Sequence, residues 1–133
     1  MDKAGLYEIY LFKVTFHDKT GGKERPVVTI SYNQRSLSFE LLGIYSDRPK
    51  YSKKVYYQDF MYQIKDYQAA GLRKISWINV RQPIIVPFTV LMGKELFGKL
   101  SQRDTEELVA FYDRYWQNHG GNTAGNNAQN RNK

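Results

Sequence analysis

Hydrophobic and polar positions alternate along most of the chain, and this alternation predicts a series of short β-strands. The first strand is expected at residues 7–16, where aromatic and β-branched residues are interleaved with polar ones. A second strand is expected at residues 26–32, after a glycine-containing loop at residues 17–24. A third, at residues 37–45, follows a short polar turn, so the second and third strands are expected to form a hairpin.

The middle of the chain predicts shorter and less regular elements. Residues 46–54 are expected to form a basic loop, and residues 55–64 one or two short strands. A helical turn ending at Gly71 is expected at residues 65–72. Residues 75–80 and 84–90 are the next predicted strands, and Pro87 favours an edge or a bend in the second of them.

The last predicted element is a helix that begins after Ser101. Ser101 is a suitable N-cap, and Asp104 follows three residues later, where a carboxylate favours the positive helix end. One apolar stripe is predicted to face the core, and the residues that form it are Leu108, Phe111, Tyr112 and Tyr115. The opposite, solvent-facing side is expected to carry Glu106, Glu107, Asp113 and Arg114.

The 133 residues predict one folded domain at residues 1–116 and a disordered tail at residues 117–133. The tail is rich in Asn and Gly and contains no large apolar residue that would offset its ordering entropy. The expected fold class is mainly β, a small antiparallel domain of five to seven strands in the barrel-like class, with a C-terminal helix.

The formal net charge of +7 is consistent with a polyanionic partner, and equally with a basic domain that has none. Most of the surplus lies between residues 48 and 81, where eight basic residues oppose two acidic ones. The basic residues are Arg48, Lys50, Lys53, Lys54, Lys65, Arg73, Lys74 and Arg81. This stretch is the expected polyanion-binding face.

Several classes of chemistry are disfavoured by the residues that are missing. The chain has no cysteine, which excludes disulfides, thiolate metal sites and cysteine catalysis. Its two histidines, His17 and His119, are isolated, so no metal site and no cofactor are expected. No apolar run has the length of a signal peptide core or a membrane span, and a cytoplasmic location without membrane contact is expected.

The remaining inventory of Arg, Lys, Ser, Thr, Tyr and carboxylates is suited to phosphoryl transfer, in which positioning and charge stabilisation dominate. RNA also supplies its own nucleophile, the 2′-hydroxyl. Arg25 opens the second predicted strand and Ser46 follows the third, so a hairpin would bring both to one end. The alternative interpretation is a solvated strand-end charge and an ordinary loop hydroxyl.

Three segments in order resemble the PemK/MazF-like toxin family, in a divergent branch. The first is RPVVTIS at residues 25–31 with the strand end IYS at residues 44–46. The second is YQIKDYQAAGLRKISWINV at residues 62–80, and the third is FGKLSQRDTEELVAFY at residues 97–112. The chain departs from the family pattern where Gly5, Leu6 and Tyr7 replace the usual Gly-Asp-Ile opening, and where Asp47 follows Ser46.

The resemblance implies a small SH3-like antiparallel β barrel with a C-terminal helix, a homodimer, and a cognate antitoxin protein as partner. The implied activity is metal-independent, sequence-selective cleavage of single-stranded RNA, with Arg25 and Ser46 as the catalytic residues. The expected RNA-binding residues are Lys23, Arg48, Lys50, Tyr51, Lys53 and Lys54. Tyr56 and Tyr57, like Tyr51, are either base-stacking residues or ordinary strand and core aromatics.

Two other functions remain compatible with the sequence. One is an RNA- or protein-binding barrel without catalytic activity, which would bind RNA in a salt-dependent way and create no new RNA ends. The other is a toxin of related fold that poisons a DNA topoisomerase through a protein interface.

Overall fold

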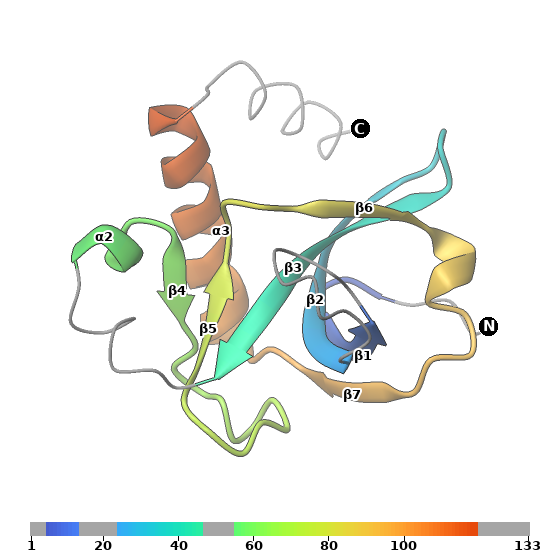
Figure 1. The fold of residues 1–133 in the computed structure, drawn as a ribbon, viewed down its shortest axis with the longest axis horizontal. Helices are drawn as coiled ribbons and strands as arrows, with labels where there is room; N and C mark the ends of the chain where they lie inside the picture. The colour runs from blue at the N-terminus through green and yellow to red at the C-terminus, as the bar shows by residue number, and fades with distance from the viewer. Residues whose placement is uncertain (1–4, 14–23, 47–54, 120–133) are drawn as a thin grey trace.

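The computed structural model describes residues 5–13, 24–46 and 55–119, and in these it is mainly β with a C-terminal helix (Figure 1). The strands are β1 (Glu8–Lys13), β2 (Glu24–Asn33), β3 (Ser38–Ser46), β4 (Met61–Gln63), β5 (Ser76–Asn79), β6 (Ile84–Pro87) and β7 (Leu96–Lys99). The helices are α2 (Val55–Gln58), the 3₁₀ helix η1 (Phe88–Val90) and α3 (Gln102–Asn118).

All seven strands of the described chain belong to one antiparallel sheet with the order β4-β5-β3-β2-β1-β7, and β6 pairs with β3. The pairing of β3 changes near its C-terminal end. Gly43 of β3 pairs with Val27 of β2, whereas the last three residues, Ile44, Tyr45 and Ser46, pair with β5. The predicted hairpin between the second and third strands is confirmed, with Asn33 in its turn accepting from the amides of Arg35 and Ser36.

The closed barrel expected from the sequence is wrong for the described residues. The end strands β4 and β7 do not pair there, and the sheet stays open. In the described chain β7 pairs only with β1 and β4 only with β5, and the backbone of the turn at residues 65–72 packs directly against Gly98 of β7. A Cβ atom placed on Gly98 would lie 1.8 Å from the carbonyl oxygen of Ala70. The turn at residues 65–72 therefore packs onto β7, whose strand partner is β1.

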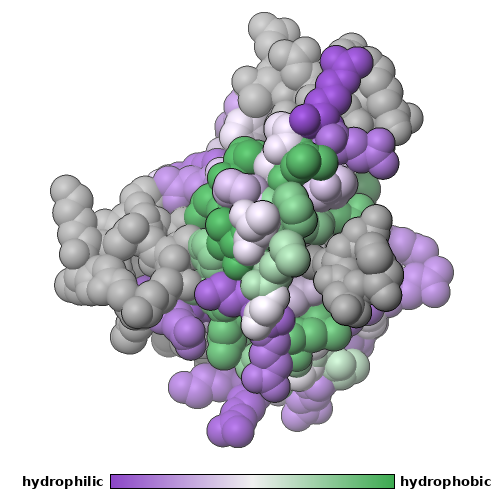
Figure 2. All heavy atoms as spheres, turned by 90° about the vertical axis from the view of Figure 1, so that its right-hand side faces the viewer, coloured by the Kyte–Doolittle hydropathy of each residue, from purple (hydrophilic) through white to green (hydrophobic). Residues whose placement is uncertain are grey.

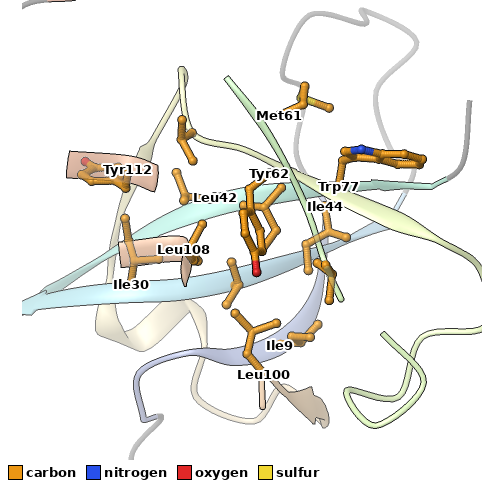
Figure 3. Packing of buried hydrophobic residues seen from close by; sticks show 14 of the residues in the cluster. Ile9, Ile30, Leu42, Ile44, Met61, Tyr62, Trp77, Leu100, Leu108 and Tyr112 are labelled. Carbon is orange, nitrogen blue, oxygen red and sulfur yellow. The ribbon is translucent and has the colours of Figure 1, made fainter. Parts of the chain in front are cut away.

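The main core lies between one face of the sheet and α3, as Figure 3 shows for Ile30 beside Leu108 and Tyr112. The predicted helix is confirmed, since the Ser101 hydroxyl accepts a hydrogen bond from the Asp104 amide at 3.1 Å. Leu108, Tyr112 and Tyr115 of the predicted stripe are buried. Each such side chain stabilises the fold by roughly 1.5 to 3 kcal/mol.

The other face of the sheet carries a second, smaller apolar cluster. Val27 belongs to this cluster and its neighbour Val28 to the main core, as expected for a strand whose side chains alternate between faces. Val86 of β6 and Leu91, which follows η1, also belong to this second cluster. Figure 2 shows hydrophobic side chains gathered in a band on the side of the molecule where η1 lies.

Several predicted elements differ from those observed. The strand predicted at residues 84–90 ends at Pro87 and is followed by the 3₁₀ helix η1. The predicted strands at residues 55–64 are instead one helical turn, α2, followed by β4. The alternation pattern does not predict strand β7, because its Leu96 and Phe97 are exposed, and only the resemblance of residues 97–112 to a strand-to-helix junction implies a strand here. Helix α3 continues to Asn118, into the predicted tail, where the His119 ring stacks on Tyr115 with the centroids 4.3 Å apart.

Candidate functional site

Arg25 is held at the start of β2 by strand pairing on one side and an aromatic ring on the other. It pairs with Phe12 of β1, and the buried Val27 and Val28 that follow it anchor the strand. Its guanidinium carbon lies 5.4 Å from the centroid of the Tyr45 ring. This distance is within the range of a cation–π interaction, which restricts the position of the charge.

Ser46 is the last residue of β3 and is exposed. It pairs with Ser76 of β5, while Tyr45 pairs with the buried Trp77. The structure therefore places the Arg25 guanidinium over the ring of Tyr45, the residue before Ser46. This contact lies at the end of the hairpin where β2 and β3 no longer pair. Because side chains alternate along a strand, Tyr45 and Ser46 belong to opposite faces of β3. Arg25 and Ser46 thus flank the same strand end and do not share one face.

The predicted RNA-binding residues lie outside the described part of the chain. These residues are Lys23, Arg48, Lys50, Tyr51, Lys53 and Lys54, and Asp47 lies outside it as well. Their roles remain predictions.

Two further basic residues come to this end of the sheet through the pairing of β3 with β5. Arg73 and Lys74 lie just before Ser76, the residue that pairs with Ser46, and both are exposed. The Ser76 hydroxyl donates to the Lys74 carbonyl at 2.8 Å, which fixes the bend that precedes β5. The sequence shows both charges, but only the strand pairing places them beside Ser46.

One cation of the predicted basic face, Lys65, is neutralised by a carboxylate of α3, and a neighbouring ion pair joins Arg103 of α3 to Asp66. Lys65 forms an ion pair with Glu107 at 2.8 Å, and the Lys65 hydrogen bond, followed by that from Tyr62, lowers the pKa of Glu107. Arg103 pairs with Asp66 at 2.6 Å, and hydrogen bonds from Arg103 and Ser101 lower the pKa of Asp66. These contacts fasten α3 to the turn at residues 65–72 and remove Lys65 from the face predicted to bind a polyanion.

A buried carboxylate lies beneath these ion pairs, and the sequence did not indicate its role. Asp104 is fully buried and accepts hydrogen bonds from the Tyr62 hydroxyl at 2.6 Å, the Lys65 amide at 2.8 Å and the Asp66 amide at 2.7 Å. Burial, and then the hydrogen bond to Asp104, raises the pKa of Tyr62 well above its usual range. All of these groups are partnered, so the network is structural.

The segment that precedes β1 is also fixed by hydrogen bonds. The Gly5 amide donates to a Glu8 carboxylate oxygen at 2.7 Å, and the Gly5 carbonyl accepts from the Thr29 hydroxyl at 2.6 Å. Glu8 also accepts from the Tyr10 hydroxyl at 2.7 Å. Burial, and then this hydrogen bond, raises the pKa of Tyr10. Gly5 is thereby joined to β1 and β2.

A small pocket, open to solvent, lies between α3 and β2, away from Arg25 and Ser46. It is lined by Tyr7, Ile30, Leu108, Val109, Tyr112 and Asp113. Among the residues that the structure describes, no cluster of three or more His, Asp or Glu side chains could hold a metal ion. No helix in the same part of the chain is long and apolar enough to cross a membrane.

Neither a protein-family model nor a curated protein matches the chain. The residues and their geometry are therefore the basis for a functional proposal.

Proposed function

We propose that the protein is a toxin of the PemK/MazF-like kind, an endoribonuclease that cleaves single-stranded RNA without a metal ion. The observation that carries the proposal is the placement of Arg25 over the Tyr45 ring, next to Ser46, at one end of the sheet. A guanidinium held in this way can donate to two phosphate oxygens and stays charged at every relevant pH.

In the proposed reaction the 2′-oxygen of RNA attacks the adjacent phosphorus and the bond to the leaving 5′-oxygen breaks. The products are a 2′,3′-cyclic phosphate and a 5′-hydroxyl, and the proton lost by the 2′-hydroxyl balances the one gained by the 5′-oxygen. Arg25 stabilises the negative charge that builds up on the phosphorane, which is the largest contribution a preorganised cation makes to such a step. Ser46 donates a hydrogen bond to the scissile phosphate from the other side of the strand end.

The charge around this strand end supports an RNA substrate. Arg73 and Lys74 are exposed beside Ser46, and the predicted RNA-binding loop at residues 48–54 leaves β3 at the same place. We propose further that the fold is related to the SH3-like barrel, and that the protein forms a homodimer, binds a cognate antitoxin and acts in the cytoplasm. The exposed apolar side chains Ile85, Met92 and Leu96 supply contact area for a protein partner. The first strand and α3, by contrast, place their apolar stripes in the core.

The test is cleavage of a long single-stranded RNA by the purified protein in EDTA, with the new 5′ ends mapped. Arg25→Ala is expected to lower the rate by at least about 100-fold, the usual effect of removing one preorganised donor to a developing oxyanion. Ser46→Ala is expected to slow cleavage at the same sites. Far-UV circular dichroism and the melting temperature show whether each variant keeps the fold.

Arg35→Ala is the matched control, because Arg35 is an exposed arginine in the turn at the other end of the same hairpin. Its cleavage rate is expected to equal that of the wild type. A folded Arg25→Ala variant with an unchanged rate would remove Arg25 from the mechanism. Salt-dependent binding without new RNA ends would instead indicate a binding module, and toxicity that depends on a topoisomerase would indicate the third function.

A further inference from the structure

A second cluster of aromatic and cationic side chains lies at the opposite end of β5 from Ser46. Arg81 follows β5, and its guanidinium carbon lies 3.8 Å from the centroid of the Phe60 ring and 5.6 Å from that of Tyr56. One guanidinium nitrogen of Arg81 donates to the Tyr56 hydroxyl at 2.8 Å. The guanidinium is therefore stacked on a buried ring and hydrogen-bonded to an exposed one.

The aromatic part of this cluster is rigid at its base and open at its tip. Phe60 is 4% exposed, whereas Tyr56 is 60% exposed. The Tyr56 ring packs edge-on against Phe60 and Tyr57, with centroid distances of 5.3 Å and 5.0 Å. Figure 1 shows the supporting helix α2 beside β4, on the opposite side of the molecule from η1. A tyrosine held in this way loses little conformational entropy when another ring stacks on it.

The charge of this surface favours a polyanion. Within the described part of the chain Arg81 forms no ion pair with a carboxylate, and the nearby Asp59 carboxylate lies 2.8 Å from Nε2 of His119. In the sequence, Lys53 and Lys54 come directly before α2. Stacked aromatic rings together with unpaired cations are the combination by which proteins bind single-stranded nucleic acid without reading its sequence.

We propose that Tyr56, Phe60 and Arg81 form a base-stacking subsite for an unpaired nucleobase of single-stranded RNA. This inference rests on the proposed function for the identity of its ligand. Arg81 comes five residues after Ser76, the partner of Ser46, which corresponds to about 16 Å along an extended strand. The base bound here belongs to a nucleotide some positions away from the scissile phosphate, so the subsite contributes to affinity and positioning and not to bond cleavage.

The experiment measures binding of a fluorescent single-stranded RNA whose 2′-oxygens are methylated, which blocks cleavage. Tyr56→Ala is expected to weaken binding by about 5- to 150-fold, the measured range for one stacked base, with an unchanged salt dependence. Tyr56→Phe keeps the ring and loses only the hydrogen bond to Arg81, so its affinity is expected to stay close to that of the wild type. Leu37→Ala is the control, because Leu37 is 49% exposed and lies in the turn between β2 and β3.

A second oligonucleotide separates stacking from other effects of the substitution. An otherwise identical strand with abasic sites is expected to bind the wild type and Tyr56→Ala equally. Equal binding of the base-containing strand by both proteins would overturn the subsite, and would be the result if this surface binds a protein instead. If the wild type cleaves RNA but Tyr56→Ala binds the base-containing strand equally well, the subsite is wrong and the proposed endoribonuclease function still stands. Base-dependent weakening without cleavage supports the subsite and contradicts the endoribonuclease.

Discussion

Replacing Asp104 is expected to destabilise the whole domain, although the residue lies at the first turn of a helix near the surface. One carboxylate oxygen accepts from the Tyr62 hydroxyl and the Lys65 amide, and the other accepts from the Asp66 amide. In Asp104→Asn, one of the two acceptor oxygens becomes an NH₂ donor that faces these donors. At least one hydrogen bond is then lost and a buried donor is left without an acceptor, at a cost of about 1 to 3 kcal/mol.

Asp104→Ala removes both oxygens and leaves all three donors without this partner. The expected loss is about 3 to 5 kcal/mol, since each unsatisfied group costs about 1 to 3 kcal/mol and neighbouring losses are not additive. Domains of this size are stable by about 5 to 15 kcal/mol in total. The alanine variant is therefore expected to be partly unfolded at moderate temperature.

Urea unfolding followed by tryptophan fluorescence measures these differences. Glu106→Gln is the control, because it removes a carboxylate charge from the same helical turn at an exposed position, and its change is expected within about 0.5 kcal/mol. Tyr62→Phe tests one donor alone and is expected to cost about 1 kcal/mol. If Asp104→Asn unfolds at the same urea concentration as the wild type, the carboxylate does not have the role assigned to it.

Two further perturbations test the contacts around α3 and β7. Gly98→Ala places a Cβ atom 1.8 Å from the Ala70 carbonyl oxygen, and the backbone movement that this requires is expected to cost about 1 to 3 kcal/mol or more in stability. The control Lys99→Ala, at an exposed position, is expected to cost about 0.5 kcal/mol or less. Equal urea midpoints for the two variants would contradict the close approach. The pKa values of the Asp66 and Glu107 carboxyls are lowered in the folded protein from their ordinary values of 3.8 and 4.5. The ion pairs of these carboxylates therefore stabilise the folded protein at pH values above 3.8 and 4.5, and this stabilisation is lost as the pH falls through the lowered pKa values. Urea midpoints measured from pH 7 to pH 3 are expected to fall less steeply in a double variant with Asp66→Asn and Glu107→Gln, and parallel curves would contradict this linkage.

The strands and the last helix were predictable because their signals are local. Alternation over residues 26–32 and 37–45 predicts β2 and β3, and the spacing of Leu108, Tyr112 and Tyr115 predicts the buried stripe of α3. Elements whose stability comes from distant contacts were missed. Strand β7 has exposed side chains, and its place in the sheet depends on pairing with β1. In the candidate site, Arg25 and Ser46 were expected at one strand end, but their arrangement on opposite faces of β3 was not.

The sequence alone determined a small, basic, mainly β domain with a capped C-terminal helix, because periodicity, turn residues and charge are properties of neighbouring positions. Only the tertiary structure decided that the sheet remains open over the described residues, that Lys65 is neutralised by Glu107, and that Arg25 stacks on Tyr45. Only the structure joined Arg81 to Tyr56 and Phe60, which lie more than twenty residues earlier in the chain. Such contacts depend on how strands that are far apart in the sequence pair and pack, and local sequence patterns do not specify these pairings.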